Sequence, residues 1–153
     1  MELIIVLGIV SAFWIFVAFG SASERRQLEH WARILTTEIR YTQNLAISEN
    51  HPHRIIIAPY APNPFFPDQS GNEYRISREG APMGEVIRRV PVEGVRIIDN
   101  SVPNRLRAIY FTSRGTPRDA ATITLETDNY RIQMTITVGG GRVLVGPVQR
   151  RIQ

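Results

Sequence analysis

Two of the three histidines, His51 and His53, form an H-x-H pair, in which two imidazoles can bind one metal ion. A metal centre needs further ligands, and no carboxylate or third histidine stands at a spacing that completes this one. The pair also flanks Pro52 where a helical pattern ends, which is typical of a solvated loop. The sequence therefore predicts a histidine pair in a loop and no metal site.

Nucleophilic and phosphate-binding residues lack the sequence contexts that such chemistry needs. Ser77, Ser101 and Ser113 do not occur in a G-x-S-x-G turn, and no His-Asp grouping lies near them to activate a hydroxyl. The chain has no cysteine, which excludes a thiolate nucleophile, thiolate metal ligands and disulfides. Residues 139–142 (GGGR) lack the following helix and Lys-Ser/Thr pair of a phosphate loop, so they predict a hairpin. We expect no catalytic residue, no cofactor and no metal ion.

The arginines are the remaining candidates for binding chemistry. All 18 basic residues are arginine and the formal charge is +4. A guanidinium binds phosphate in a bidentate way, and clustered arginines give sequence-independent, salt-dependent binding to nucleic acid. In the alternative interpretation they pair with nearby carboxylates or face solvent, where an isolated pair contributes about 0 to 1 kcal/mol. The candidate DNA-binding residues are Arg114, Arg118, Arg142, Arg150 and Arg151.

The chain opens with an apolar run, residues 3–19, directly after a single charged residue, Glu2. At ~1.5 Å rise per residue the run crosses most of a ~30 Å hydrocarbon core, so residues 1–22 are predicted to form the transmembrane half of a helix. A carboxylate costs roughly 2.5 to 3.5 kcal/mol at the centre of a membrane helix. We therefore expect Glu2 to lie at the headgroup level or to pair with another charge.

Residues 23–50 continue as an amphipathic helix. Apolar residues recur four, three and four positions apart, which places them on one face. No proline or clear break separates Phe19 from Ser48, so we predict one helix of nearly fifty residues that ends at His51-Pro52. The buried face is expected to contain Leu28, Ala32, Leu35, Ile39, Thr42 and Ala46, and the other sides to carry Glu24, Arg25, Glu29, Arg33, Glu38 and Arg40.

After this helix the apolar period changes from 3.6 to two, which predicts strands. Asp128-Asn129 indicates a two-residue hairpin, because both residues tolerate the positive φ of a primed turn. Residues 139–141 mark another reversal, and the prolines of 58–71 indicate a long loop. The expected class is α+β: a long N-terminal helix packed on an antiparallel β-rich domain, 51–153. The predicted strands are 54–58, 73–78, 85–90, 95–98, 106–112, 121–127, 130–138 and 142–148.

The segment from Glu2 to Ala12 (ELIIVLGIVSA) resembles the N-terminus of type IV pilins and type II secretion pseudopilins, in which one glutamate opens a long apolar helix. The resemblance implies a single-pass inner-membrane protein with its C-terminal domain outside the cytoplasm, and methylation as a modification. It also implies partners: other pilin or pseudopilin subunits through this helix, the assembly platform and the inner membrane. In the filament Glu2 would pair with the N-terminal amine of a neighbouring subunit.

Residues before and after the apolar run leave its processing open. No basic leader precedes Glu2, whereas Arg25 and Arg26 follow the run, and the positive-inside rule would then place the domain in the cytoplasm. We therefore expect an upstream basic leader that ends in glycine. The alternatives are an ordinary signal anchor, and a secretory signal peptide cleaved near the small residues 20–23 (GSAS).

The second half contains four segments that carry a resemblance: 109–115 (IYFTSRG), 122–125 (TITL), 130–132 (YRI) and 141–143 (GRV). Through them it resembles the C-terminal domain of the GspH/FimT group, whose members are minor pseudopilins of type II secretion systems or minor pilins. Some of these minor pilins bind DNA during uptake through a Gly-Arg-x-Arg motif. Residues 141–144 (GRVL) have leucine in place of the second arginine. A structural subunit is therefore the expected function, with a DNA-binding minor pilin and, more remotely, an anchored extracytoplasmic enzyme as alternatives.

Overall fold

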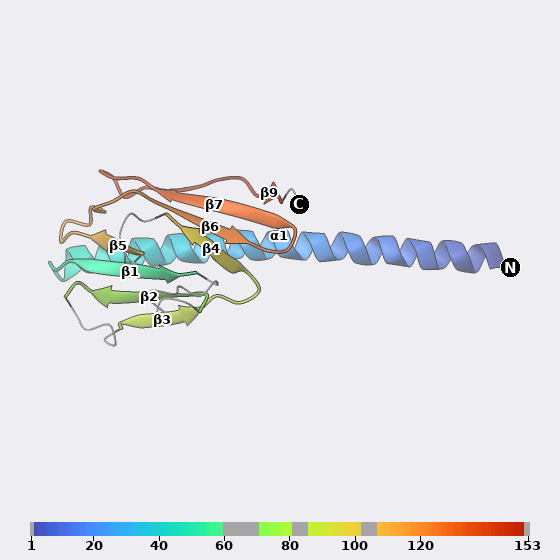
Figure 1. Cartoon of the computed structure of the whole chain (residues 1–153), viewed down its shortest axis with the longest axis horizontal. Helices are drawn as coiled ribbons and strands as arrows, with labels where there is room; N and C mark the ends of the chain where they lie inside the picture. Colours follow the sequence, from blue (N-terminus) through green and yellow to red (C-terminus); the bar gives the residue numbers. More distant parts are fainter. Residues whose placement is uncertain (1, 60–70, 81–85, 102–106, 152–153) are drawn as a thin grey trace.

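The N-terminal helical pattern forms one continuous helix, α1 (Glu2–Ser48), whose first half projects beyond the rest of the molecule (Figure 1). The structure is a computed structural model that describes residues 2–59, 71–80, 86–101 and 107–151, and only the backbone of 2–22 and 99–100. At about 1.5 Å per residue, 47 residues give a length of about 70 Å. The predicted single helix is confirmed.

A Schellman motif ends α1 a few residues before Pro52. Asn50 adopts a left-handed conformation with φ of 49°. The amide of His51 donates to the Ala46 carbonyl at 3.2 Å, and the amide of Asn50 donates to the Ile47 carbonyl at 3.2 Å. These two bonds satisfy carbonyls that the end of the helix leaves free. The helix therefore stops at Ser48 because of Asn50 rather than because of the proline.

The first sheet is antiparallel, with the strand order β3-β2-β1-β5. It contains β1 (His53–Ala58), β2 (Glu73–Arg78), β3 (Arg88–Pro91) and β5 (Ala108–Phe111). The central strand β1 is buried at all six positions, because neighbouring segments cover both of its faces. This explains why its sequence, HRIIIA, does not alternate between apolar and polar residues.

The second sheet has the order β4-β6-β7-β8, and β9 also pairs with β7. Its strands are β4 (Arg96–Asn100), β6 (Ala121–Glu126), β7 (Tyr130–Ile136), β8 (Val143–Val145) and β9 (Gln149–Arg150). In β6 buried residues alternate with half-buried ones, as the sequence predicts. The predicted strand 142–148 is too long, because β8 ends at Val145 before Gly146 and Pro147, and β9 was not predicted.

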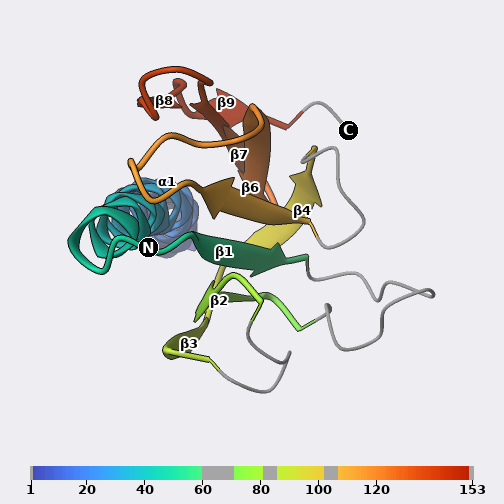
Figure 2. The ribbon, with the colours of Figure 1, turned by 90° about the vertical axis from the view of Figure 1, so that its left-hand side faces the viewer.

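The core lies where α1 packs against both sheets. Figure 2, viewed along the helix, shows α1 on one side of both sheets, with β1, β2 and β3 below and β6, β7 and β8 above. Leu28, Leu35 and Ile39 of α1 are fully buried and form one cluster with Ile55 of β1 and Met134 of β7. Burying each such side chain stabilises the fold by about 1.5 to 3 kcal/mol. The predicted buried face of α1 is confirmed.

The β6–β7 hairpin forms at the predicted residues but with a different turn. The amide of Thr127 donates to the Tyr130 carbonyl at 2.9 Å, which closes a two-residue loop. Neither Asp128 nor Asn129 has a positive φ, so the expected primed turn is wrong. Asn129 instead donates from its amide (3.1 Å) and from its side chain (2.9 Å) to the carboxylate of Glu24. A contact with the helix therefore fixes this turn, which local turn preferences do not reveal.

Candidate assembly surface

The second half of α1 is fastened to the domain by polar bonds near its two ends as well as by the core. Near its start, the Glu24 carboxylate accepts the two bonds from Asn129. Two turns later, the indole nitrogen of Trp31 donates to the Glu93 carbonyl at 2.8 Å. Near its end, Gln43 Nε2 donates to the Gly115 carbonyl at 2.7 Å. These bonds join α1 to three separate loops and hold it at a fixed angle on the domain.

The projecting half of α1 begins at Glu2. Its backbone is helical throughout, and the side chains of residues 2–22, including the Glu2 carboxylate, lie outside the described residues. Within the part of the chain that the structure describes, no helical segment is both long and apolar enough to span a bilayer. The predicted membrane half, 1–22, and the role of Glu2 therefore stay predictions.

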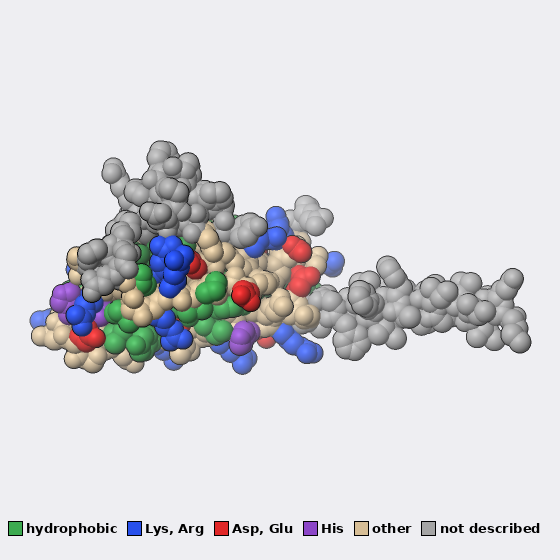
Figure 3. Space-filling model, turned by 90° about the horizontal axis from the view of Figure 1, so that it is seen from below, with side chains coloured by type: hydrophobic (Ala, Val, Ile, Leu, Met, Phe, Trp, Pro, Cys, Tyr) green, Lys and Arg blue, Asp and Glu red, His purple; other side chains and the backbone are tan. Residues whose placement is uncertain are grey.

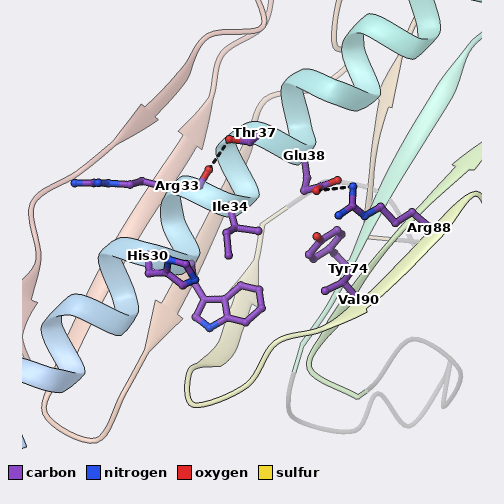
Figure 4. A pocket seen from close by; sticks show the side chains of 9 residues that line it. His30, Arg33, Ile34, Thr37, Glu38, Tyr74, Arg88 and Val90 are labelled. Atoms are coloured by element: carbon purple, nitrogen blue, oxygen red, sulfur yellow. Dashed lines mark hydrogen bonds and ion pairs between the residues drawn. The ribbon is translucent and has the colours of Figure 1, made fainter.

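A hollow of about 390 Å³ lies between α1 and the edge strand β3 (Figure 4). Glu38, predicted to lie on an exposed side of α1, is only 6% exposed and faces this hollow. Its Oε1 pairs with the guanidinium of Arg88 at 3.0 Å, and the Tyr74 ring lies beside the pair. Burial, followed by the nearby Glu38 charge, raises the pKa of Tyr74 to about 12. The expectation for Glu38 is wrong, because this part of α1 is covered by the first sheet.

The candidate DNA-binding arginines fall into two groups at opposite ends of the domain. Arg114 and Arg118 follow β5, and Arg142 precedes β8 in the glycine hairpin. The loops of the first group meet at Gln43, which bonds to Gly115 and closely approaches Gly141. Arg150 and Arg151 lie in and beside β9, which pairs with the opposite end of β7, near the point where α1 leaves the domain (Figure 1).

Two of the five candidate arginines have ion-pair partners. Arg118 forms a two-point pair with Glu79, at 2.5 and 2.6 Å, and lies over the Tyr110 ring. Arg151 lies 3.7 Å from a carboxylate oxygen of Glu126. No ion pair joins the other three, Arg114, Arg142 and Arg150, to any residue in the described ranges. Exposed guanidiniums of this kind remain available to an anionic partner.

The histidine pair has a structural environment. His53 is fully buried, and its Nδ1 lies 2.8 Å from the His51 carbonyl oxygen. Its Nε2 lies 3.3 Å from the carboxylate of Glu49, which also accepts a bond from Arg78. Among the described residues, no three histidine, aspartate or glutamate side chains are grouped so that they could hold a metal ion. The pair differs from the predicted solvated loop in that His53 is buried at the start of β1.

Solved structures with a similar fold exist. The type IV minor pilin FimU of Pseudomonas aeruginosa superposes with a TM-score of 0.60 at 16% identity, over 82% of this chain and 92% of FimU. The chain has a pilin-like fold. The minor pseudopilin EpsH of the Vibrio cholerae type 2 secretion system superposes with a TM-score of 0.54 at 11% identity, over 78% of this chain and 95% of EpsH. No protein-family model and no curated protein matches the sequence.

The resemblance to minor pilins and pseudopilins is thus confirmed at the level of the fold.

In this pilin-like fold, Asn72 is a structural residue that the sequence did not single out. Its side-chain nitrogen donates to the carbonyls of Val92, at 2.5 Å, and Val95, at 2.7 Å. Its side-chain oxygen accepts a bond from the amide of Ile97 at 2.7 Å. Asn72 therefore ties the start of β2 to the segment that crosses from the first sheet to the second.

Proposed function

We propose that this chain is a non-enzymatic, structural subunit of a type II secretion pseudopilus or a type IV pilus. The observation that supports this is the single helix α1, which is clamped to the domain along its second half and extends beyond it along its first half (Figure 1). An apolar rod with a fixed domain at one end can move from lipid into a bundle of similar rods without refolding. The likeness to a minor pilin and a minor pseudopilin supports the same function.

In the proposed mechanism residues 1–22 anchor the subunit in the inner membrane, with the domain on the extracytoplasmic side. The assembly platform then transfers the apolar half of α1 from lipid into the core of the filament. Glu2 fixes the register, because a carboxylate in an apolar surrounding is strongly favoured to pair with an opposite charge, here the N-terminal amine of a neighbouring subunit. The β-rich domain faces outward and distinguishes this subunit from its neighbours.

Replacing Glu2 by alanine tests this function. In cells that carry the corresponding machinery, Glu2→Ala subunits should reach the inner membrane in normal amounts but fail to enter sheared filaments, because the register-setting charge is lost. Glu93→Ala is the control, since Glu93 is exposed on the domain and its bond to Trp31 uses only its backbone oxygen. Filament incorporation of Glu2→Ala at the level of the control would refute the assembly role.

DNA binding is the second candidate function, and the positions of Arg114 and Arg142 favour it. Both are exposed, lie in loops that meet at Gln43, and have no ion pair among the described residues. With Leu144 in place of a further arginine, we expect duplex binding only in the non-specific range of about 10⁻⁴ to 10⁻⁶ M at physiological salt. The logarithm of the binding constant should fall by about 0.9 per phosphate neutralised for each decade of salt.

A fluorescence-anisotropy titration with duplex DNA measures this affinity. If the first group of arginines is the site, Arg142→Ala should weaken binding more than Arg150→Ala, which lies at the other end of the domain. Submicromolar, salt-sensitive binding that is lost in Arg142→Ala would make DNA capture the primary function. Equal effects of the two variants would mean that the arginine groups do not act as a localised site.

A further inference from the structure

Three arginines repeat every seven residues along the exposed side of α1. Arg26, Arg33 and Arg40, here named the arginine ridge, lie on the side of the helix opposite Leu28 and Leu35. Seven residues correspond to a rise of about 10.5 Å, so the ridge spans about 21 Å along the helix axis. In Figure 3, where α1 forms the lower edge of the domain, blue arginine side chains recur along that edge.

The carboxylates in the described part of α1 have partners other than the ridge arginines. Glu24 accepts bonds from Asn129, Glu29 pairs with Arg25 at 3.2 Å, and Glu38 pairs with Arg88 across the hollow. In the part of the chain that the structure describes, no ion pair involves a ridge arginine. The ridge is therefore a line of positive charge that this chain does not neutralise itself.

Hollows lie on both sides of the arginine ridge. On one side is the hollow between α1 and β3, where Trp31, Ile34 and Val90 form part of the wall. On the other side, a hollow of about 370 Å³ separates α1 from β8. Apolar residues such as Ile132 and Val145 form one part of its wall, and Arg25, Glu29 and Arg33 form another. A rod-shaped partner lying along α1 could place side chains in either hollow while its acidic groups face the ridge.

The spacing of the ridge indicates the shape of its partner. A second α-helix has the same rise per residue, so acidic residues repeated every seven positions would meet all three arginines. A membrane surface would reach only one end of the ridge if α1 crosses the bilayer, as in the proposed function. Two parallel copies of this chain would bring ridge against ridge, and facing like charges oppose such packing.

We propose that the arginine ridge binds an acidic helical face of a different subunit in the same filament. This inference rests on the proposed function, because it assumes that pilin-like helices lie side by side. It makes this chain a subunit that inserts next to unlike neighbours and does not polymerise alone along this face. The partner is recognised by carboxylates at heptad spacing and by apolar residues beside them.

A charge-reversed copy of this chain serves as the acidic probe. The full-length variant R26E/R33E/R40E is mixed with wild type in lipid vesicles, each protein carrying Thr37→Cys. Thr37 is exposed between two ridge arginines, and the natural chain has no cysteine, so an oxidative cross-link reports contact at this face alone. We expect mixed cross-links to exceed both homodimers by about tenfold at low salt and to fall towards them in about 0.5 M NaCl, where the Debye length is only a few ångströms.

Two further variants keep the test decisive. R114E/R142E/R150E reverses three exposed arginines that belong to the β-rich domain and not to α1, and mixing it with wild type should leave cross-linking at the homodimer level. R26Q/R33Q/R40Q removes the positive charges of the ridge without adding negative ones. Its homodimer should therefore cross-link more than the wild-type homodimer, and this result does not depend on how well the charge-reversed chain folds. Equal mixed and homodimer yields, or no gain in the glutamine variant, would refute the proposal.

Other outcomes are also interpretable. If duplex DNA binds wild type and loses affinity for R26Q/R33Q/R40Q but not for R114E/R142E/R150E, the ridge is a nucleic-acid surface and the proposal is wrong. The vesicle experiment needs no filament, whereas the Glu2→Ala experiment measures only filaments. A chain that enters filaments through Glu2 but shows no charge-selective cross-linking would refute the ridge proposal alone.

Discussion

Replacing Asn72 by alanine removes the three side-chain bonds that join β2 to the segment between the sheets. Each bond contributes about 0.5 to 1.5 kcal/mol, so their loss should cost about 2 to 4 kcal/mol. Asn72 also has φ of 54°, a left-handed conformation that asparagine tolerates and alanine resists by about 1 kcal/mol. The expected loss in free energy of unfolding is therefore about 3 to 5 kcal/mol.

Asn50 provides a matched control for the backbone contribution. It has nearly the same φ, 49°, but it is exposed at the end of α1 and only its backbone takes part in the helix cap. Asn50→Ala should therefore lose only the conformational part, about 1 kcal/mol. Asn72→Gly should lose only the part due to the side-chain bonds, because glycine accepts the positive φ but makes none of the three bonds.

Urea unfolding of the full-length protein in detergent, followed by tryptophan fluorescence, measures these losses. In a Trp14→Phe background Trp31 is the only tryptophan, and its bond to Glu93 places it beside the segment that Asn72 holds. Equal losses for Asn72→Ala and Asn50→Ala would refute the reasoning, because they would show that the three bonds contribute nothing beyond the backbone conformation. A loss in Asn72→Gly below about 1 kcal/mol would contradict it as well.

Gly115→Ala should destabilise the domain by about 2 to 4 kcal/mol in the same urea titration, because φ is +77° and the new methyl group would lie 2.6 Å from Ile47 Cδ1. Gly139→Ala, with φ of +93° and open space around it, should lose only about 1 kcal/mol, and similar losses for both would contradict the packing argument. Burial raises the pKa of Tyr74 to about 12, so an absorbance titration should show a tyrosine ionisation step near that pH, which a Tyr74→Phe variant should lose. Because the pKa of Tyr74 is raised in the folded state, its contribution to the free energy of unfolding is complete below pH 10 and is lost as the pH rises towards 12. The free energy of unfolding should therefore fall by about 2 to 3 kcal/mol less over this range in Tyr74→Phe than in wild type. An equal fall in both proteins would show that Tyr74 is not buried as described.

Local patterns predicted the elements of this fold, because helix and strand periodicity depend on neighbours in sequence. The face of α1 from Leu28 to Ala46 and the alternation in β6 follow from such patterns and are confirmed. Contacts between distant residues were not predictable in this way. The Glu38 side chain is buried because strand β2 brings Tyr74 against α1, and the Asp128-Asn129 turn is held by Glu24, more than a hundred residues earlier in the chain. Neither contact leaves a signal in the residues next to it.

The candidate arginine site was predictable only in part, because residue types are visible in the sequence but their positions in space are not. The arginines were recognisable by type, but only the pairing of β7 with β8 and β9 shows that Arg142 and Arg150 lie at opposite ends of one strand. The two arginines are close in sequence but far apart in space, because the chain between them runs along the length of β7. The Glu2 expectation, by contrast, depends on partner subunits and stays a prediction.

The polar bonds of α1 at Glu24, Trp31 and Gln43 also determine how the molecule would respond to mechanical load. They are distributed over 19 residues, which is about 28 Å of helix at ~1.5 Å per residue. A pull along the helix axis would load these bonds and the apolar contacts between them together, in shear, rather than one after another as in peeling. The domain would therefore move with the helix as one rigid body under such a load.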